Sequence, residues 1–319
     1  YGGDADYTAM VARSLTLWRA LALETGRDLY METGILTLGQ PDDGYTLPGF
    51  ATMQAAGLPV SRLTHEECRE RFPQFQVEEY GAITYNAVGG ILQATACVQA
   101  LAQQLQARGG TLHEGVRVKR VEPEGDGGRV VLEDGTTLRA DRVIVTAGAW
   151  IHDVLPGLQL PVRPIRGQVC YFEGLPAEAF GVGSFPTFLA GAEAYGFPLH
   201  GPGWFKVGAD SPGVDADPNV PYPPDQYEID ALRRFLHRVI PAAADATLVL
   251  VERCMHDLTP DEDIILDHHP GGRGVVIGSG FSGHGFKFGP LIGELLAAWA
   301  YGEKPEFPLG RFRLSRFVE

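Results

Sequence analysis

The glycine-rich segment GSGFSG (278–283) constrains the fold more than any other feature of this sequence. Its glycines have the G-x-G-x-x-G spacing of a turn that brings a dinucleotide to the start of a helix. The preceding run GVVIG (274–278) is short and β-branched, which predicts a buried strand, and residues 291–301 predict a helix. A strand, a glycine turn and a helix in this order indicate an α/β protein.

The dinucleotide fingerprint has a second half, which does not follow this turn. A second strand must carry an acidic residue for the ribose, and the sequence ends at Glu319 before such a strand. We therefore expect Gly278, Gly280 and Gly283 to let the backbone approach a planar or anionic group at a helix start, and not to bind a pyrophosphate. A turn that only packs the helix on the strand is the alternative.

The other patterns predict a mixed α/β fold, in which a nucleotide-binding unit is interleaved with an antiparallel-sheet unit. Helices are expected at 7–25, 50–56, 95–108 and 224–239. Strands are expected at 35–38, 111–121, 129–133, 136–139, 141–146, 168–172, 194–198, 204–208 and 248–252. We assign residues 83–155 and 255–319 to the nucleotide-binding unit, and residues 1–82 and 156–254 to the sheet unit.

The charge balance bears on the partners. Lysine and arginine number 26 against 40 acidic residues, a net charge of −14, which opposes nucleic acid and anionic membranes but leaves a local basic pocket possible. No stretch approaches the roughly 18 apolar residues of a spanning helix. The four cysteines are widely spaced and lack metal-ligand spacing, so we expect no disulfide framework, no metal site and a reducing, cytoplasmic location. The expectation is a monomer or weak homo-oligomer that acts on a small molecule.

Several segments together resemble the monomeric sarcosine oxidase and N-methyl amino acid oxidase family, within the D-amino-acid-oxidase-type flavoproteins. The strongest are GFSGHGFKF (280–288) and the upstream pair of Cys254-Met255-His256 and Thr259-Pro260-Asp261. Weaker matches are ADRVIVTAGAW (140–150), VRPIRGQVCYFE (162–173), YGFP (195–198) and FKVGAD (205–210). The resemblance runs from Tyr1 to about Phe312, nearly the whole chain.

The resemblance implies FAD as the cofactor, held by the nucleotide-binding unit. Cys254 would carry it through a thioether to the 8α-methyl carbon, which needs a cation near the thiol to lower its pKa. A buried, inert cysteine is the alternative, and it is our interpretation of Cys68, Cys97 and Cys170. The further FAD contacts implied are Val118, Ala147, Gly148, Trp150, Met255, Gly280, Phe281, Gly283, His284, Gly285, Phe286 and Lys287.

The resemblance also implies catalytic roles for two lysines. Lys206 would activate O2 by stabilising developing superoxide, and Lys287 would bind the substrate carboxylate. Tyr195, Asp210 and His256 would line the substrate site. The implied reaction oxidises the C–N bond of a secondary amine or N-substituted amino acid to an imine: the neutral amine loses hydride equivalents to FAD, and O2 is reduced to H2O2.

Two departures from the family concern the substrate. Sarcosine-oxidising members have Tyr in place of His256 and His in place of Asp210. An acid in place of an imidazole changes both polarity and charge near the amine. We therefore expect a secondary amine other than sarcosine, either different or larger. A cationic or sugar-bearing amine, with which Asp210 could pair, is one candidate.

A third departure concerns the start of the sequence. Family members open with a strand, a glycine turn, an acidic residue and an Arg, and Tyr1 aligns just after that Arg. We expect either a native N-terminal part outside this sequence, which we favour because Lys206, Cys254 and Lys287 are all present, or a truncated, non-catalytic paralogue. A flavin dehydrogenase that passes electrons to a carrier other than O2 is the further alternative.

Overall fold

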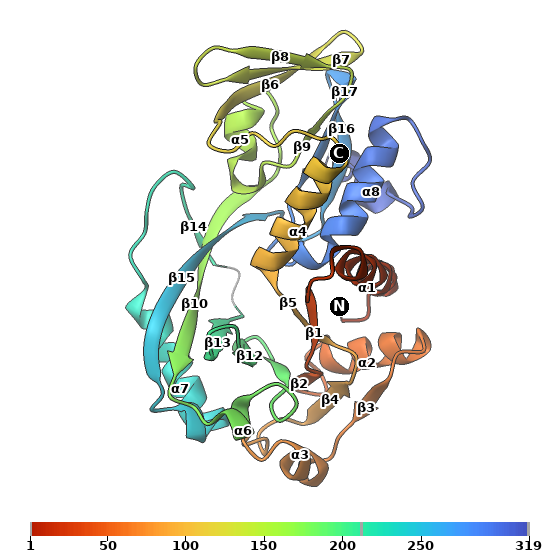
Figure 1. Cartoon of the computed structure of the whole chain (residues 1–319). Coiled ribbons are helices and arrows are strands. Elements are labelled where there is room, and N and C mark those ends of the chain that lie inside the picture. Colours follow the sequence, from red (N-terminus) through yellow and green to blue (C-terminus); the bar gives the residue numbers. More distant parts are fainter. Residues whose placement is uncertain (1, 211–212, 318–319) are drawn as a thin grey trace.

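The computed structural model describes residues 2–210 and 213–317, so the outermost positions of the predicted ranges, Tyr1 and 318–319, lie outside it. The fold is mixed α/β, as the sequence predicts, and is built on one large sheet and three smaller ones within these residues (Figure 1). The large sheet has the strand order β14-β10-β13-β12-β11-β2-β4-β3. Strands β13 and β14 pair with one edge of β10, and β15 pairs along the opposite edge.

The large sheet is almost wholly antiparallel, with one parallel pair between β2 and β11. Its strands are β2 (Ile35–Gly39), β3 (Val60–Arg62), β4 (Ala82–Asn86), β10 (Arg163–Glu173), β11 (Thr187–Ala190), β12 (Ala194–His200), β13 (Trp204–Ala209), β14 (Val214–Asp215) and β15 (Thr247–Leu258). Strands β10 and β15 run side by side as two long, curved ribbons (Figure 1). Phenylalanines dominate the core on this sheet, among them Phe172, Phe188, Phe205 and Phe235 of helix α7 (Gln226–Val239).

A second body contains the glycine turn. Strand β17 (Gly272–Ser279) lies between β16 (Ile265–His269), antiparallel to it, and β9 (Val143–Val145), parallel to it. Helix α8 (Gly289–Ala300) follows the turn and packs on β17, so the expected strand, turn and helix are all present. A ribbon of β6 (Val118–Glu124), β7 (Gly127–Leu132) and β8 (Thr137–Ala140) packs beside this sheet.

Two strand predictions in this body are corrected. The strand predicted at 111–121 begins only at Val118, because the residues before it are exposed and include the left-handed Gly115. The strand predicted at 141–146 is limited to Val143–Val145 and is not wholly buried. Ile144 is 43% exposed, because alternate side chains of a strand point to opposite faces.

The N-terminal helix α1 (Ala5–Thr25) packs against α8, near the other end of the chain. The side chain of Asp4 caps it by accepting a hydrogen bond from the Tyr7 N–H, and the left-handed Gly26 ends it. Tyr7 and Met10 share a core with Leu291 of α8, and Figure 1 shows the two helices side by side.

The remaining elements complete the described chain. They are β1 (Tyr30–Glu32), which pairs with β5 (Gly90–Leu92), the α-helices α2 (Thr46–Ala55), α3 (His65–Arg71), α4 (Ala94–Ala107), α5 (Ile151–Val154) and α6 (Ala177–Phe180), and the 3-10 turns η1 (Gly148–Trp150), η2 (Pro241–Ala243), η3 (Phe286–Phe288), η4 (Gly310–Phe312) and η5 (Leu314–Phe317). None of the helices in residues 2–210 and 213–317 combines the length and the apolar character needed to cross a membrane. Strand β15 continues across the predicted boundary at 254/255, and the division into two domains stays a prediction.

Candidate active site

One face of the large sheet gathers most of the predicted chemistry. Residues paired across neighbouring strands point to the same side of a sheet, and so do residues two apart on one strand. Cys254 pairs with Gly167 of β10, and His256 follows it two positions along β15. Lys206 of β13 pairs with Tyr171 of β10, two pairs further along this face. The strand register therefore places the thiol, the imidazole and the ammonium on one surface.

Lys206 lies among aromatic rings on this face. Its Nζ is 5.0 Å from the ring centre of Phe197 and 5.7 Å from that of Tyr171, within the range of cation–π attraction. Burial lowers the pKa of Lys206, while the negative charges of Cys254 and Glu252 act to raise it.

Cys254 differs from the other three cysteines. Cys68, Cys97 and Cys170 are fully buried, and burial raises the pKa of each thiol to about 11, in agreement with an inert role. Cys254 is partly exposed. Burial raises the pKa of its thiol, and the Lys206 ammonium opposes that rise. A reactive thiol needs a cation of this kind.

The glycine turn is fixed by a buried carboxylate that the sequence analysis missed. Asp257 accepts hydrogen bonds from the Gly280 N–H at 2.7 Å, the Phe281 N–H at 3.1 Å and the Ser279 hydroxyl at 3.2 Å. Burial raises the pKa of Asp257, and these donors partly offset the rise. Because the N–H groups of Gly280 and Phe281 are already bonded to protein, they do not serve a pyrophosphate. In the sequence, the available signal for this role is an acidic residue at a position where the alternation of the strand predicts a buried side chain.

The turn itself requires left-handed backbone at three positions. Gly280, Ser282 and Gly283 have φ values of 66°, 50° and 75°. A glycine adopts this conformation without steric cost, whereas Ser282 is held there by hydrogen bonds, its N–H donating to the Asp257 carbonyl and its hydroxyl to that of Gly280.

His256 links the sheet to the turn. A Cβ atom built on Gly167 would lie 3.9 Å from His256 Nε2, and one built on Gly283 would lie 3.7 Å from the same ring. The imidazole therefore stands between β10 and the glycine turn. Burial lowers the pKa of His256, which favours the neutral ring.

Lys287 lies on the far side of the turn, in η3. Its Nζ donates to the His284 carbonyl at 3.0 Å, and its own carbonyl accepts from the Trp18 indole at 2.9 Å. The Trp18 ring also stacks on Phe286, with ring centres 5.9 Å apart. Burial lowers the pKa of Lys287 to about 8. Helix α1 thus anchors the segment that carries the predicted carboxylate-binding lysine.

The predicted substrate residues Tyr195 and Asp210 lie at the same end of the sheet. The Tyr195 ring covers Gly208, and burial together with Cys254 and Asp210 raises its pKa to about 12. Burial and the Glu262 carboxylate raise the pKa of Asp210. Burial and the Asp210 carboxylate also raise the pKa of Tyr45. Tyr45 and Glu262 are two neighbours of Asp210 that the sequence analysis did not single out.

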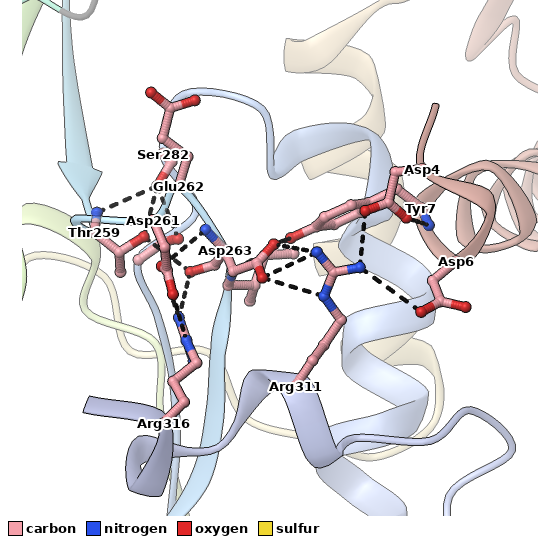
Figure 2. A network of polar contacts seen from close by, with 12 residues as sticks. Asp4, Asp6, Tyr7, Thr259, Asp261, Glu262, Asp263, Ser282, Arg311 and Arg316 are labelled. Carbon is pink, nitrogen blue, oxygen red and sulfur yellow. Dashed lines mark hydrogen bonds and ion pairs between the residues drawn. The ribbon is translucent and has the colours of Figure 1, made fainter. Parts of the chain in front are cut away.

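The loop after β15, residues 259–264, is held by a network of ion pairs (Figure 2). Arg311 donates to Asp263 at 2.8 Å and to Asp4 at 2.8 Å, and Tyr7 donates to the same Asp263 carboxylate at 3.0 Å. Arg316 pairs with Asp261 at 2.8 Å. The network thus holds the loop that carries Glu262, whose negative charge acts on Asp210.

The predicted FAD contacts from other elements are spread over β6, η1 and β15. Ala147, Gly148 and Trp150 belong to or flank η1, which lies against β10 and β15. Trp150 is 40% exposed and its indole donates to Asn219. Val118 pairs with Leu132 in the β6–β7 ribbon, and Met255 lies on the opposite face of β15 from Cys254.

The residues on this face fit the flavin end of FAD. A flavin ring held through a thioether would need a thiol, a cation near it and a flat surface, and Cys254, Lys206 and Gly167 could offer these. Gly167 has no side chain opposite Cys254, and within the described chain the His256 ring alone comes within 4 Å of the missing Cβ. The position opposite the thiol is therefore not filled by a side chain of β10.

A thiol and a lysine on one sheet face, together with the glycine turn of a mixed α/β fold, agree with a flavin-dependent oxidoreductase. Residues 1–299 match the family described as "FAD dependent oxidoreductase", and the chain belongs to it. It is an FAD-dependent oxidoreductase of the sarcosine oxidase and N-methyl amino acid oxidase type.

The comparisons with relatives extend over nearly the whole chain. The peroxisomal sarcosine oxidase of Homo sapiens is 31% identical over 325 residues, which cover 98% of this chain and 82% of that protein. The monomeric sarcosine oxidase of Bacillus sp. (strain B-0618) is 33% identical over 331 residues, covering 99% and 83%. The crystal structure of L-proline dehydrogenase from P. horikoshii superposes with a TM-score of 0.86 at 22% identity, covering 99% and 84%, which shows the shared fold.

Proposed function

We propose that this protein oxidises the C–N bond of a secondary amine or N-substituted amino acid to an imine, with FAD joined covalently to Cys254 and with O2 reduced to H2O2. The observation that carries the proposal is the placement of Cys254 and Lys206 on one sheet face beside the open position at Gly167. Bound FAD supplies the two-electron acceptor that no side chain offers.

Side chains of this face and of the segment after the glycine turn each have a task in the proposed reaction. Lys287 binds the substrate carboxylate through a charge-assisted hydrogen bond. Tyr195 and His256 form walls of the substrate site, and the neutral His256 does not repel a positively charged amine. Lys206 supplies positive charge where O2 acquires negative charge, which lowers the barrier to its reduction.

Asp210 and Glu262 set the substrate class in this proposal. The relatives named above are sarcosine oxidases, and sarcosine is a small amino acid with no second cationic group. Here, burial and repulsion by the Glu262 carboxylate raise the pKa of Asp210. A substrate with a positive group beyond its reacting amine relieves that repulsion, so we propose a larger, cationic secondary amine.

The remaining assignments complete the proposal. We assign FAD contact to Val118, Ala147, Gly148, Trp150, Met255 and the 280–287 turn, with residues 83–155 and 255–319 as the FAD-binding domain. A cytoplasmic monomer or weak homo-oligomer agrees with four free cysteines and a net charge of −14.

Anaerobic reduction of the FAD-loaded protein tests the reaction. Sarcosine, neutral N-methyl amino acids and N-methyl amino acids with a second ammonium group are mixed with the protein, and the oxidised flavin absorbance is followed. We expect the cationic substrates to bleach the flavin fastest, and admitted O2 to restore it with one H2O2 per turnover. Bleaching that O2 does not reverse would identify a dehydrogenase, and a protein that never takes up FAD would contradict the proposal.

A further inference from the structure

Tyr171 and Glu252 form a hydrogen-bonded pair beside Lys206. The Tyr171 hydroxyl donates to Glu252 Oε2 at 2.6 Å. Tyr171 pairs directly with Lys206 across β10 and β13, and Glu252 lies two positions before Cys254 on β15. The pair therefore shares the face of the sheet that carries the proposed O2 site.

The surroundings of Lys206 show what this pair does. From β15 the lysine faces Glu252 and Cys254, from β10 it faces Tyr171, and from the β12 side it faces Phe197, with Tyr195 two residues away. Glu252 is the carboxylate among these groups. Its negative charge favours the protonated lysine, whereas burial disfavours it.

The Tyr171 hydroxyl can only act as a donor toward this carboxylate. Burial raises the pKa of Tyr171, and the bond to Glu252 raises it further, so the phenol keeps its proton. Trp204 packs against the Tyr171 ring with centres 5.9 Å apart, which holds the ring in place. Tyr171 thus fixes an otherwise exposed glutamate next to the lysine.

We propose that Tyr171 and Glu252 are positioning residues for Lys206: Tyr171 orients the Glu252 carboxylate, and the carboxylate keeps the lysine charged over the pH range in which the protein reduces O2. The inference rests on the proposed role of Lys206. It adds two residues to which the resemblance assigned no role.

The protonation of Lys206 can be measured without any activity. The sequence contains four lysines, Lys119, Lys206, Lys287 and Lys304, so ¹³C-lysine labelling gives few signals, and a Lys206→Arg variant assigns the one of interest. The Lys206 signal is titrated in the FAD-free and FAD-loaded chain. We expect Glu252→Gln to move the Lys206 titration to lower pH and Tyr171→Phe to move it less, in the same direction. Glu78→Gln, which removes a carboxylate paired with Arg69, is the matched control and leaves it unchanged.

The oxidative reaction gives the second readout. Glu252→Gln should shift the alkaline limit of the flavin reoxidation rate to lower pH and leave anaerobic reduction by substrate unchanged. In a Lys206→Met background, which we expect to slow reoxidation by about 10²–10³-fold, adding Glu252→Gln should cause no further change.

The outcomes separate the two levels of the account. If Lys206→Met leaves reoxidation unchanged, the proposed O2 role of Lys206 fails, while the lysine titration still tests the pair. If Glu252→Gln leaves the Lys206 titration where it was, the pair is a strand cross-link alone and the inference is overturned. A change in reoxidation by Glu252→Gln that persists without Lys206 would overturn it as well.

Discussion

The buried carboxylate of Asp257 accepts a 2.7 Å hydrogen bond from the backbone N–H of Gly280. This bond joins the end of β15, which carries Cys254, to the glycine turn that follows β17. The Asp257 side chain thus helps to fix the strand that carries the proposed flavin-linked thiol relative to the turn. The N–H groups of the turn therefore bond to a carboxylate of the protein itself, that of Asp257.

Replacing Asp257 with asparagine should destabilise the fold by about 1–3 kcal/mol. One carboxylate oxygen would become an NH2 group, and the buried N–H that it accepted, such as that of Phe281, would then face another donor. Urea unfolding measures the loss. Asp43→Asn is the matched control, because Asp43 also accepts backbone N–H groups but is exposed to water. Equal losses for the two variants would contradict the account.

Lys287 predicts a pH limit on the use of amino-acid substrates. Burial lowers its pKa to about 8, so the free protein carries the ammonium below that pH and loses it above. A substrate carboxylate needs the ammonium, and kcat/KM for flavin reduction should therefore fall above about pH 8. This alkaline decrease in kcat/KM should be absent when the substrate is replaced by its amide, and absent in the Lys287→Gln variant. A decrease that survives in Lys287→Gln would show that another group titrates there.

Asp210 predicts a difference between substrates. Asp210→Asn should lower kcat/KM for a cationic N-methyl amino acid by roughly tenfold, about 1.4 kcal/mol, because a favourable charge pair is lost. Sarcosine, which has no second cation, should be used as well as before or better. The measurement is anaerobic flavin reduction with both substrates. An equal loss with both would mean that Asp210 supports the fold and does not select the substrate.

The ion-pair network of Figure 2 predicts a stability difference between two arginines. Arg311→Met should cost about 2 kcal/mol, because Asp263 and Asp4 both lose a charged donor and Asp263 is largely buried. Arg13→Met removes two exposed pairs, to Glu294 and Glu306, and should cost less than about 1 kcal/mol. Thermal unfolding of both variants checks the ranking, and a reversed order would contradict it.

The sequence predicted much of the fold because its strongest signals are local. The left-handed Gly26 ends α1, and Thr64 and Glu67 form a capping box at the start of α3, so both helix ends depend on residues next to them in the sequence. The run before Gly278 is a strand and the segment after the turn a helix, because β-branched apolar residues and helical spacing act over short distances.

The contacts that complete the site could not be predicted in this way. Asp257 and Glu262 look like ordinary polar residues in the sequence, and their effects depend on partners brought close by folding. The Tyr171–Glu252 pair depends on the register of β10 against β15, which is set by side-chain packing across the sheet. Glu262 also has φ of 60°, uncommon for a residue with a Cβ, which no local pattern signals.

Acid precipitation of the FAD-loaded protein tests the central claim most directly. The flavin of the parent protein should remain in the pellet, on the peptide that contains Cys254, because a thioether survives denaturation. The flavin of Cys254→Ser should appear in the supernatant, although the variant still binds it before precipitation. Flavin in the supernatant from both proteins would contradict attachment at Cys254, and flavin in the pellet from both would place the bond on another residue.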